Sequence, residues 1–264
     1  MQPTFFINHG GGPCFFLEPG PMRGAWRELE SYLRGFAGML EEQPRSILVV
    51  SGHWEEVRPT VNTGAAPPLL FDYGGFPEHT YRLTWPAPGN PQLAARVRDL
   101  LGSAGIESDA DATRGWDHGV FVPLKVMFPD ASIPTVQLSL QQGLDPGAHL
   151  AIGKALAPLR SEGVLIVGSG QSYHNMRGFM GRSGSIDPAA EAFDAWLREA
   201  IADGDTRDRS LIAWEQAPGA RQAQPHEDHL LPLMVAAGAA SGEPGRTVFH
   251  GHALAKPISG FRFG

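Results

Sequence analysis

The sequence predicts a single α/β domain over residues 1–264, with a mixed central β-sheet that is flanked by helices on both faces. Short apolar runs typical of buried strands alternate along the chain with segments of helical periodicity. The length of 264 residues and the hydrophobic content of 42% are sufficient for one large core. Neither an internal repeat nor a clear linker divides the sequence, so we expect one domain.

The expected strands are short runs rich in β-branched and aromatic residues. They are residues 4–8, 46–52, 133–140 and 163–170, with edge strands from Thr247 onward. The run Ile47 to Val50 is wholly apolar and then stops abruptly at Ser51, Gly52, His53 and Trp54. We expect a rigid buried strand that carries His53 at its carboxyl end, with Trp54 packed behind it.

The expected helices follow from apolar residues that recur at helical spacing. They are Arg23 to Glu42, Pro91 to Gly102, Ala148 to Glu162, Asp187 to Asp203, and a helix that starts near Glu227. Residues 115–130 are predicted to form an apolar turn or helix, whereas residues 72–91 are predicted to form a long loop rich in aromatic residues, Pro and Gly. Pro91 suits the first position of its helix, where a missing N–H costs little.

Composition disfavours several classes of partner. The formal charge is −7 and no basic tract is present, so we do not expect nucleic acid as a partner. No apolar run approaches the roughly 20 residues that cross a bilayer, and no signal peptide is apparent. The single cysteine, Cys14, fits a reducing compartment, so we expect a cytoplasmic protein in which Cys14 packs near the pocket.

Histidines follow three of the expected strands. His9, His53 and His174 each come at or shortly after the carboxyl end of a strand, which is where ligands bind in open α/β sheets. A lone histidine in such a place is more often a hydrogen-bonded core residue, but three at one rim indicate a functional site. Imidazole is a common metal ligand, so a metal site is the favoured interpretation.

Two further histidines extend this set. His229 precedes an apolar run and is expected at the boundary of the core, whereas His226 is expected to be exposed. His118 is either part of the site or a hydrogen-bonded loop residue. His79 has a weaker claim, and the remaining three are assigned to the surface or the tail: His149, His250 and His252.

The residue types constrain the metal only partly. A single cysteine excludes a structural zinc site of the cysteine type. Imidazole and carboxylate ligands suit Zn, Fe, Mn or Ni. The residues alone therefore leave both metal-dependent hydrolysis and oxygen chemistry open.

Seven segments, in order along residues 4 to about 240, resemble one known family. They read HGGGP, VVSGHW, FDYGGFPEHTYRLTWPAPGNP, GWDHGVFVPLKVMFPD, IPTVQLSL, GSGQSYHN and EDHLLPLMVAAGA. The sequence is similar to the DOPA-dioxygenase type of class III extradiol ring-cleaving dioxygenases, which are related to the catalytic subunit of protocatechuate 4,5-dioxygenase. The resemblance implies insertion of both atoms of O2 into a catechol-type aromatic diol, with extradiol (meta) cleavage of the ring.

The resemblance also assigns roles to residues. It places the metal ligands at His9, His53 and His229, with Fe(2+) as the active ion and Zn(2+) as an ion that can be found bound. It makes His174 the acid/base residue, with a role as fourth ligand as an alternative, and puts His118 beside the pocket. Three aromatic residues are expected to wall the substrate ring: Tyr73, Phe76 and Tyr81.

The sequence departs from the family pattern in two places. The first motif, His9 to Pro13, is one residue longer than the usual His-Gly-Ser-Pro. The protocatechuate branch uses a glutamate as third ligand, whereas here the match falls on His229, with Glu227 two residues away. Arg82 and Arg177 are candidates for binding a charged group on the substrate side chain.

Two other functions remain as alternatives. One is a zinc-dependent hydrolase that uses the same histidines, and the other is a non-catalytic binding protein similar to the Memo type. The residues leave the oligomeric state open, including a homo-oligomer.

Overall fold

One eight-stranded mixed sheet forms the centre of the computed structural model, which describes residues 1–181 and 187–264. The strand order is β4-β3-β5-β2-β6-β1-β8-β7. The strands are β1 (Thr4–Asn8), β2 (Ser46–Glu56), β3 (Thr60–Asn62), β4 (Asp109–Asp111), β5 (Thr135–Gln141), β6 (Val164–Gly170), β7 (Gly245–Ala253) and β8 (Lys256–Phe263). The central strands β5, β2, β6 and β1 are parallel, whereas β3 with β5, β1 with β8, and β7 with β8 pair antiparallel.

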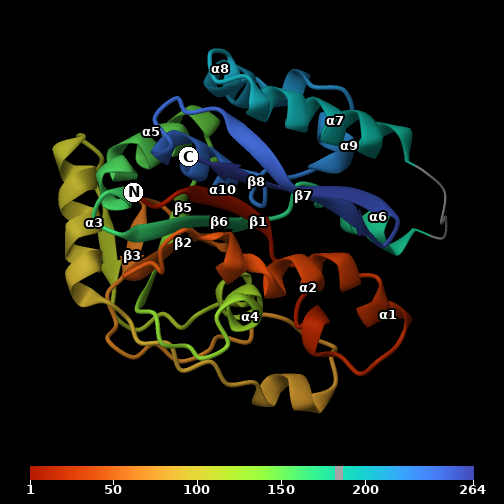
Figure 1. Cartoon of the computed structure of the whole chain (residues 1–264), viewed down its shortest axis with the longest axis horizontal. Coiled ribbons are helices and arrows are strands. Elements are labelled where there is room, and N and C mark those ends of the chain that lie inside the picture. The colour runs from red at the N-terminus through yellow and green to blue at the C-terminus, as the bar shows by residue number, and fades with distance from the viewer. Residues whose placement is uncertain (182–186) are drawn as a thin grey trace.

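Helices cover both faces of this sheet (Figure 1). On one face lie α5 (Pro146–Leu156), α7 (Pro188–Ala202), α8 (Arg207–Ile212) and α10 (Leu231–Ala239), and on the other α1 (Pro21–Gly24), α2 (Arg27–Arg34) and α4 (His118–Met127). The remaining α-helices are α3 (Pro91–Ser103), α6 (Met176–Met180) and α9 (Ala220–Ala223). Short 3-10 helices are η1 (Cys14–Phe16), η2 (Phe36–Met39), η3 (Glu78–Arg82), η4 (Ala157–Arg160) and η5 (Trp214–Gln216). The predicted α/β class with helices on both faces is confirmed.

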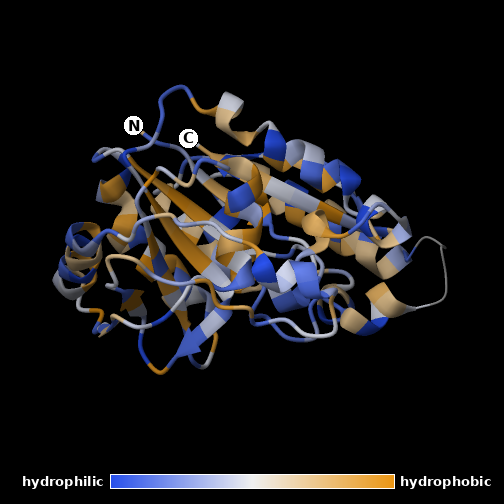
Figure 2. Cartoon of the chain, turned by 90° about the horizontal axis from the view of Figure 1, so that it is seen from below, coloured by the Kyte–Doolittle hydropathy of each residue, from blue (hydrophilic) through white to orange (hydrophobic). Residues whose placement is uncertain are grey.

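The core lies between the sheet and its two helical layers. All residues of β1 and β6 are buried, and Figure 2 shows hydrophobic residues concentrated in the central strands. Helix α10 is apolar all round and every one of its residues is buried, as expected for a helix enclosed by a sheet and other helices. This helix packs against β6, β1 and α5.

Several predicted helices are shorter in the structure, and glycine and proline explain the differences. The helix expected over Arg23 to Glu42 ends at Gly35, because glycine is a poor helix former. The helix expected over Ala148 to Glu162 becomes α5 followed by η4, whose second residue is Pro158. By contrast, α3 is close to its predicted range, with Pro91 at its start and the Asn90 side chain accepting from the Leu93 N–H.

Two other predictions about the C-terminal part need correction. The helix expected to start near Glu227 begins at Leu231, because residues 225–230 form turns that precede it. Of the two tail strands, only β7 lies at the edge, since β8 is placed between β1 and β7. The predicted helix over Asp187 to Asp203 is present as α7, capped by the Asp187 side chain.

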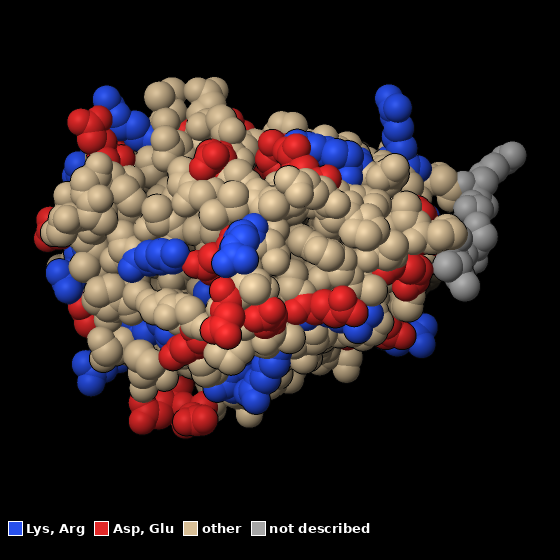
Figure 3. All heavy atoms as spheres, turned by 90° about the horizontal axis from the view of Figure 1, so that it is seen from above, with Lys and Arg blue, Asp and Glu red and all other residues tan. Residues whose placement is uncertain are grey.

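The surface is mixed in charge. On the face shown in Figure 3, Lys and Arg side chains are interspersed with Asp and Glu. Within residues 1–181 and 187–264, no helix is long and apolar enough to cross a membrane.

Candidate metal centre and active site

The carboxyl ends of three neighbouring parallel strands bring three of the predicted histidines together. Strands β2, β6 and β1 are adjacent in the sheet. His9 directly follows β1, His53 lies in the last part of β2, and His174 comes shortly after β6. This is the rim at which we expected them, because parallel strands all end on the same side of a sheet.

An irregularity in β2 positions His53. The pairing of β2 with β5 is regular up to Val50 and resumes at Glu55, so the residues between them bulge out of the ladder. Such bulges re-aim side chains and are frequent beside active sites. Trp54 is buried, as expected, and the Arg114 guanidinium lies 4.7 Å from its ring centre.

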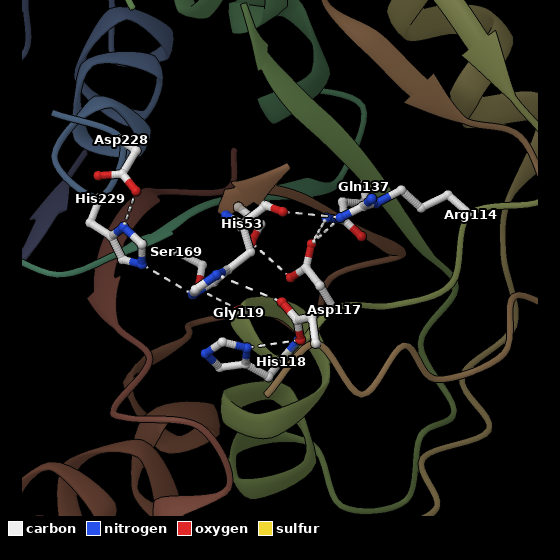
Figure 4. A network of polar contacts seen from close by, with 11 residues as sticks. His53, Arg114, Asp117, His118, Gly119, Gln137, Ser169, Asp228 and His229 are labelled. Carbon is white, nitrogen blue, oxygen red and sulfur yellow. Dashed lines mark hydrogen bonds and ion pairs between the residues drawn. The ribbon is translucent and has the colours of Figure 1, made fainter. Parts of the chain in front are cut away.

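His229 enters from the helical layer above the sheet. It lies two residues before α10, and its carbonyl accepts a 2.9 Å hydrogen bond from the Gln171 N–H just beyond β6. Its Nδ1 lies 2.8 Å from a carboxylate oxygen of Asp228, which fixes the ring so that Nε2 faces inward. This Nε2 lies 3.0 Å from the Nε2 of His53 (Figure 4).

His9, His53 and His229 form a cluster in which one ring nitrogen from each lies within 4.8 Å of the others. His9 is 2% exposed, and neither of its ring nitrogens has a hydrogen-bond partner among the described residues. Burial, followed by the positive charge that neighbouring histidines carry when protonated, lowers the pKa of both His9 and His53. These rings are therefore neutral near pH 7 and have lone pairs available.

The cluster fits a single metal ion. Buried nitrogens without partners are costly, and a cation that accepts their lone pairs removes that cost. Two nitrogens that each lie about 2.1 Å from one ion at a right angle are about 3.0 Å apart, and the His53 and His229 nitrogens are 3.0 Å apart. The carboxylate of Asp228 behind His229 is the usual support of a metal-binding histidine.

His118 borders this cluster from the opposite helical layer. It is the first residue of α4, and its ring centre lies 3.9 Å from that of His53. The Asp72 carboxylate accepts hydrogen bonds from the His118 backbone N–H at 2.9 Å and from Nδ1 at 2.8 Å. Burial tends to raise the pKa of Asp72, but the hydrogen bond and charge of His118 outweigh it and lower the pKa. His118 thus presents Nε2 as its free nitrogen.

His174 stacks on His229. The ring centres are 3.4 Å apart with the planes at 18°, and the Nδ1 of His174 is 3.8 Å from a carboxylate oxygen of Asp228. Burial and then the charge of His229 lower the pKa of His174 to about 3. The ring is therefore neutral near pH 7 and 23% of its side chain is exposed.

A buried polar network holds the strand that carries His53 (Figure 4). Asp117 is fully buried and accepts hydrogen bonds from Ser51 at 2.8 Å, from Arg114 at 3.1 Å and from Gln137. Arg114 also donates to the carbonyl of His53 at 3.1 Å. The network ties β2, β5 and the start of α4 together and so fixes the relative positions of His53 and His118.

The histidines lie in a cavity of about 420 Å³. Its lining is His9, Gly10, Gly11, Gly12, Met22, Trp26, His53, Tyr73, Phe76, His118, Gln171, His174, Met176, Phe179, Met180, His229 and Leu254. All five histidines that the resemblance assigns to the site are present. The volume lies in the range typical of sites for small organic ligands.

Not every residue that we predicted for the site reaches it. Tyr73 and Phe76 line the cavity, but Tyr81 does not, and its ring packs against Tyr73 at 5.3 Å between centres. Neither Arg82 nor Arg177 is among the lining residues, and Arg82 is paired with Glu78.

Three assignments of other residues are settled by their contacts. The prediction that His149 lies at the surface is wrong, because it is fully buried and its Nδ1 and Nε2 lie within hydrogen-bond distance of the Asp145 carbonyl and the Gln141 N–H. Glu227 pairs with Arg221 at 2.6 Å instead of joining the histidine cluster. Cys14 is buried, as expected, and burial raises the pKa of its thiol.

The sequence interpretation missed both carboxylates that orient the histidines. Asp228 is adjacent to His229, and the usual support of metal-binding histidines by carboxylates was the signal that could have identified it. Asp72 is 46 residues from His118 and no local pattern connects them. Other apolar residues of the cavity wall, among them Met22, Met176 and Met180, were also missed, because each reads as an ordinary packing or surface residue in the sequence.

Comparison with known proteins defines the class of this enzyme. Residues 3–260 match the family of the catalytic LigB subunit of aromatic ring-opening dioxygenase. The chain therefore belongs to this family and is an extradiol dioxygenase.

Individual relatives agree with this assignment. The chain is 39% identical over 254 residues to a 4,5-DOPA dioxygenase extradiol of Beta vulgaris, covering 95% of this chain and 91% of that protein. A 4,5-DOPA dioxygenase extradiol of Escherichia coli is 33% identical over 265 residues, covering 100% of this chain and 91% of the relative. A crystal structure of an uncharacterised protein from Escherichia coli K12 superposes with a TM-score of 0.81 at 29% identity, covering 100% of both chains. The predicted family is confirmed.

Proposed function

We propose that this enzyme binds one Fe(2+) ion through His9, His53 and His229 and inserts both atoms of O2 into a catechol-type substrate beside its two hydroxyls. The observation that carries the proposal is the convergence of three imidazoles from separate parts of the chain, two of whose nitrogens are 3.0 Å apart. Three protein ligands leave coordination positions open, which a catalytic metal requires.

Bound ferrous iron would supply the redox chemistry that links an electron-rich catechol to dioxygen. The protein holds its ligands in place through partly buried partners: Asp228 supports His229, and Arg114 fixes the backbone at His53. Gly10 to Gly12 line the cavity and leave it open beside His9, because glycines lack side chains. Zn(2+) suits the same nitrogens and can replace iron in a purified sample.

His174 acts as the acid/base residue in this proposal. Burial lowers the pKa of His174 and keeps its imidazole neutral at physiological pH, and a neutral imidazole has a lone pair that can accept a proton from a catechol hydroxyl. The carboxylate of Asp228, 3.8 Å from Nδ1, favours the protonated ring that results. That ring then returns the proton to the oxygen of the opening product.

His118 and two aromatic residues position the substrate. Asp72 holds His118 through Nδ1, so its Nε2 lone pair can accept a hydrogen bond from a catechol hydroxyl. Tyr73 and Phe76 lie on the cavity wall, where they can contact the face or edge of an aromatic ring.

Anaerobic loading with Fe(2+), followed by a catechol and air, tests the proposal. We expect one equivalent of iron per chain, uptake of one O2 per catechol and a yellow ring-opened product. Protein loaded with Zn(2+) alone should give no ring opening.

The same preparation separates the two alternative functions. Hydrolysis of an aryl ester with Zn(2+) alone, without ring opening by the iron form, would replace the proposal with a zinc hydrolase. A protein that binds neither Fe(2+) nor Zn(2+), and does not bind catechol after incubation with Fe(2+), would be a non-catalytic protein of the Memo type.

A further inference from the structure

The outer wall of the cavity is apolar. Beyond the histidines, Gln171 and Tyr73, the lining is glycine and hydrophobic side chains, and it includes no Lys, Arg, Asp or Glu among the described residues. The Tyr73 hydroxyl donates to the Thr80 carbonyl at 2.7 Å, and the Gln171 amide donates to the Gly10 carbonyl at 2.7 Å. The Tyr73 hydroxyl and the Gln171 NH2 group are therefore engaged within the protein, whereas the side-chain oxygen of Gln171 is buried without a partner among the described residues.

The mouth of the cavity exposes hydrophobic surface to solvent. Met22, Met176 and Met180 are 55%, 53% and 74% exposed, and all three line the cavity. They are three of the seven large hydrophobic side chains that are exposed in the part of the chain that the structure describes. Clustered exposed apolar residues around a concave site indicate a surface that a ligand covers. Methionine suits this place because its flexible thioether adapts to different apolar shapes.

These residues come from separate segments that meet at the site. Met22 lies on α1, which Figure 1 shows on the side of the sheet opposite α10, whereas Met176 and Met180 lie on α6. A catechol with both hydroxyls at the histidines has its ring in the interior of the cavity. Since the cavity volume of about 420 Å³ falls in the range that holds drug-sized ligands, space remains for a ring substituent toward the methionines.

We infer that the enzyme acts on catechols with an uncharged, apolar ring substituent, and that Met22, Met176 and Met180 bind this substituent. The inference rests on the proposed function, because the catechol is placed by its hydroxyls at the metal centre. An amino acid side chain such as that of DOPA would place an ammonium and a carboxylate against the apolar wall. Charged groups without partners are costly to remove from water, so this wall discriminates against them.

A series of matched catechols tests the inference on the full-length, Fe(2+)-loaded enzyme. The series comprises 4-methylcatechol, 4-propylcatechol, 3-(3,4-dihydroxyphenyl)propanoate and L-DOPA. Each methylene that becomes buried should raise kcat/KM about fourfold, and the two charged compounds should fall about ten- to hundredfold below 4-propylcatechol. Calorimetry without oxygen measures binding in the absence of turnover, and affinities should follow the same order.

The outcomes distinguish this inference from the proposed function. If L-DOPA or the propanoate equals or exceeds 4-propylcatechol in kcat/KM and affinity, the apolar preference is wrong while ring opening stands. If 4-propylcatechol binds with the expected preference but is not opened, the proposed reaction is wrong while the apolar binding site stands. If no catechol binds, both are wrong.

Variants at exposed positions locate the discrimination. Met180→Lys should raise kcat/KM for the propanoate about two- to fivefold, the worth of an exposed ion pair, and lower it for 4-propylcatechol. Ile212→Lys is the matched control, because Ile212 is 52% exposed on α8 and does not line the cavity. An equal effect of both lysines would overturn the role of the methionines.

Arg177 allows the reverse experiment, in which a positive charge near the cavity is removed instead of added. It is exposed on α6 but is absent from the cavity lining. Arg177→Gln should leave the order of the four catechols unchanged. A selective loss of activity toward the propanoate in this variant would show that the Arg177 guanidinium binds the carboxylate of the substituent. This result would overturn the inference.

Discussion

His9 illustrates what individual residues contribute to the site. It is a polar side chain with 2% exposure, and both its ring nitrogens lack hydrogen-bond partners within the described chain. A structural histidine in a core satisfies its nitrogens, as His149 does through the Asp145 carbonyl and the Gln141 N–H. This contrast distinguishes His9, whose nitrogens are available to a ligand, from His149, whose hydrogen bonds stabilise the fold.

His53→Ala should remove most of the bound metal. The variant keeps only two of the three clustered imidazoles. Two protein ligands are too few to hold the ion against a chelator. Metal content of the purified protein after dialysis, measured by mass spectrometry, checks this. His79→Ala is the control, because His79 is exposed, lies outside the histidine cluster and has its Nε2 3.0 Å from the Phe16 carbonyl. Full occupancy in His53→Ala would remove His53 from the ligand set.

His174→Ala should keep the metal and the catechol but open the ring slowly. Loss of an acid/base group reduces the rate by about two to four orders of magnitude, whereas the three clustered histidines remain. Single-turnover kinetics and metal analysis measure the two effects separately. His226→Ala is a matched control, since the His226 side chain is 66% exposed and its Nδ1 also lies 3.3 Å from a carboxylate oxygen of Asp228.

Two results would contradict the role of His174. A near-normal rate in His174→Ala would make it a bystander. Loss of the metal would make it a ligand first, so that four protein residues hold the ion.

At the scale of elements, the close contact of β6 with the turn before α10 places His229. A Cβ atom added at Gly170 would lie 2.0 Å from the carbonyl oxygen of His229, so only glycine allows this approach. The Gln171 N–H then bonds to that same carbonyl. The contact connects the end of a central strand to a histidine that is 59 residues away in the sequence.

Gly170→Ala should weaken metal binding, and the loss of affinity should exceed that of a variant with a similar loss of stability elsewhere in the fold. The added methyl group pushes the His229 backbone away, and such overpacking costs about 1–3 kcal/mol. Gly153→Ala is the matched control, because a Cβ there would lie 2.2 Å from the Val235 carbonyl, within the α5–α10 contact. Both variants should unfold at lower urea concentrations, but only Gly170→Ala should raise the dissociation constant for Zn(2+). Equal effects on metal affinity would contradict the role of the β6 contact.

At the scale of the whole molecule, the parallel part of the sheet concentrates ligands at one rim while the helical layers supply their partners. His229 comes from the layer of α10, and His118 comes from the layer of α4. The site therefore depends on the complete stack of helix, sheet and helix. Global unfolding and loss of the site should accordingly occur together.

His149 should make global stability depend on pH. Burial lowers the pKa of His149, so the folded protein keeps its ring neutral while the unfolded chain binds a proton below about pH 6.5. The stability that the neutral ring contributes is present above about pH 6.5 and is lost as the pH falls toward the lowered pKa of the folded state. This loss is at most about 1.4 kcal/mol per pH unit.

Urea unfolding of the wild type and of His149→Gln at pH 7.5 and pH 5.0 measures this contribution. The other buried histidines are common to both proteins, so the difference between the two pH dependences isolates His149. His252→Gln is the control, because His252 is 52% exposed. An unchanged pH dependence in His149→Gln would show that this ring binds protons equally in the folded and unfolded states, and would contradict the prediction.

The sequence alone determined the fold class, the central strands β1, β2, β5 and β6, and the places of the histidines relative to those strands, whereas the short strands β3 and β4 were not predicted. These features depend on patterns within a few residues: apolar runs fix the strands, and His9, His53 and His174 follow three of them. Parallel pairing then requires the carboxyl ends to lie on one side, so their meeting at one rim was predictable.

Tertiary structure alone decided the features that depend on residues far apart in the chain. The pairing of Asp72 with His118, the burial of His149 and the apolar wall formed by Met22, Met176 and Met180 are not visible in any local pattern. A local sequence shows that a side chain is apolar or charged, but burial and partners are set when distant segments pack together. For this reason the sequence pointed to the metal centre, whereas the surface that selects the substrate became apparent only in the folded protein.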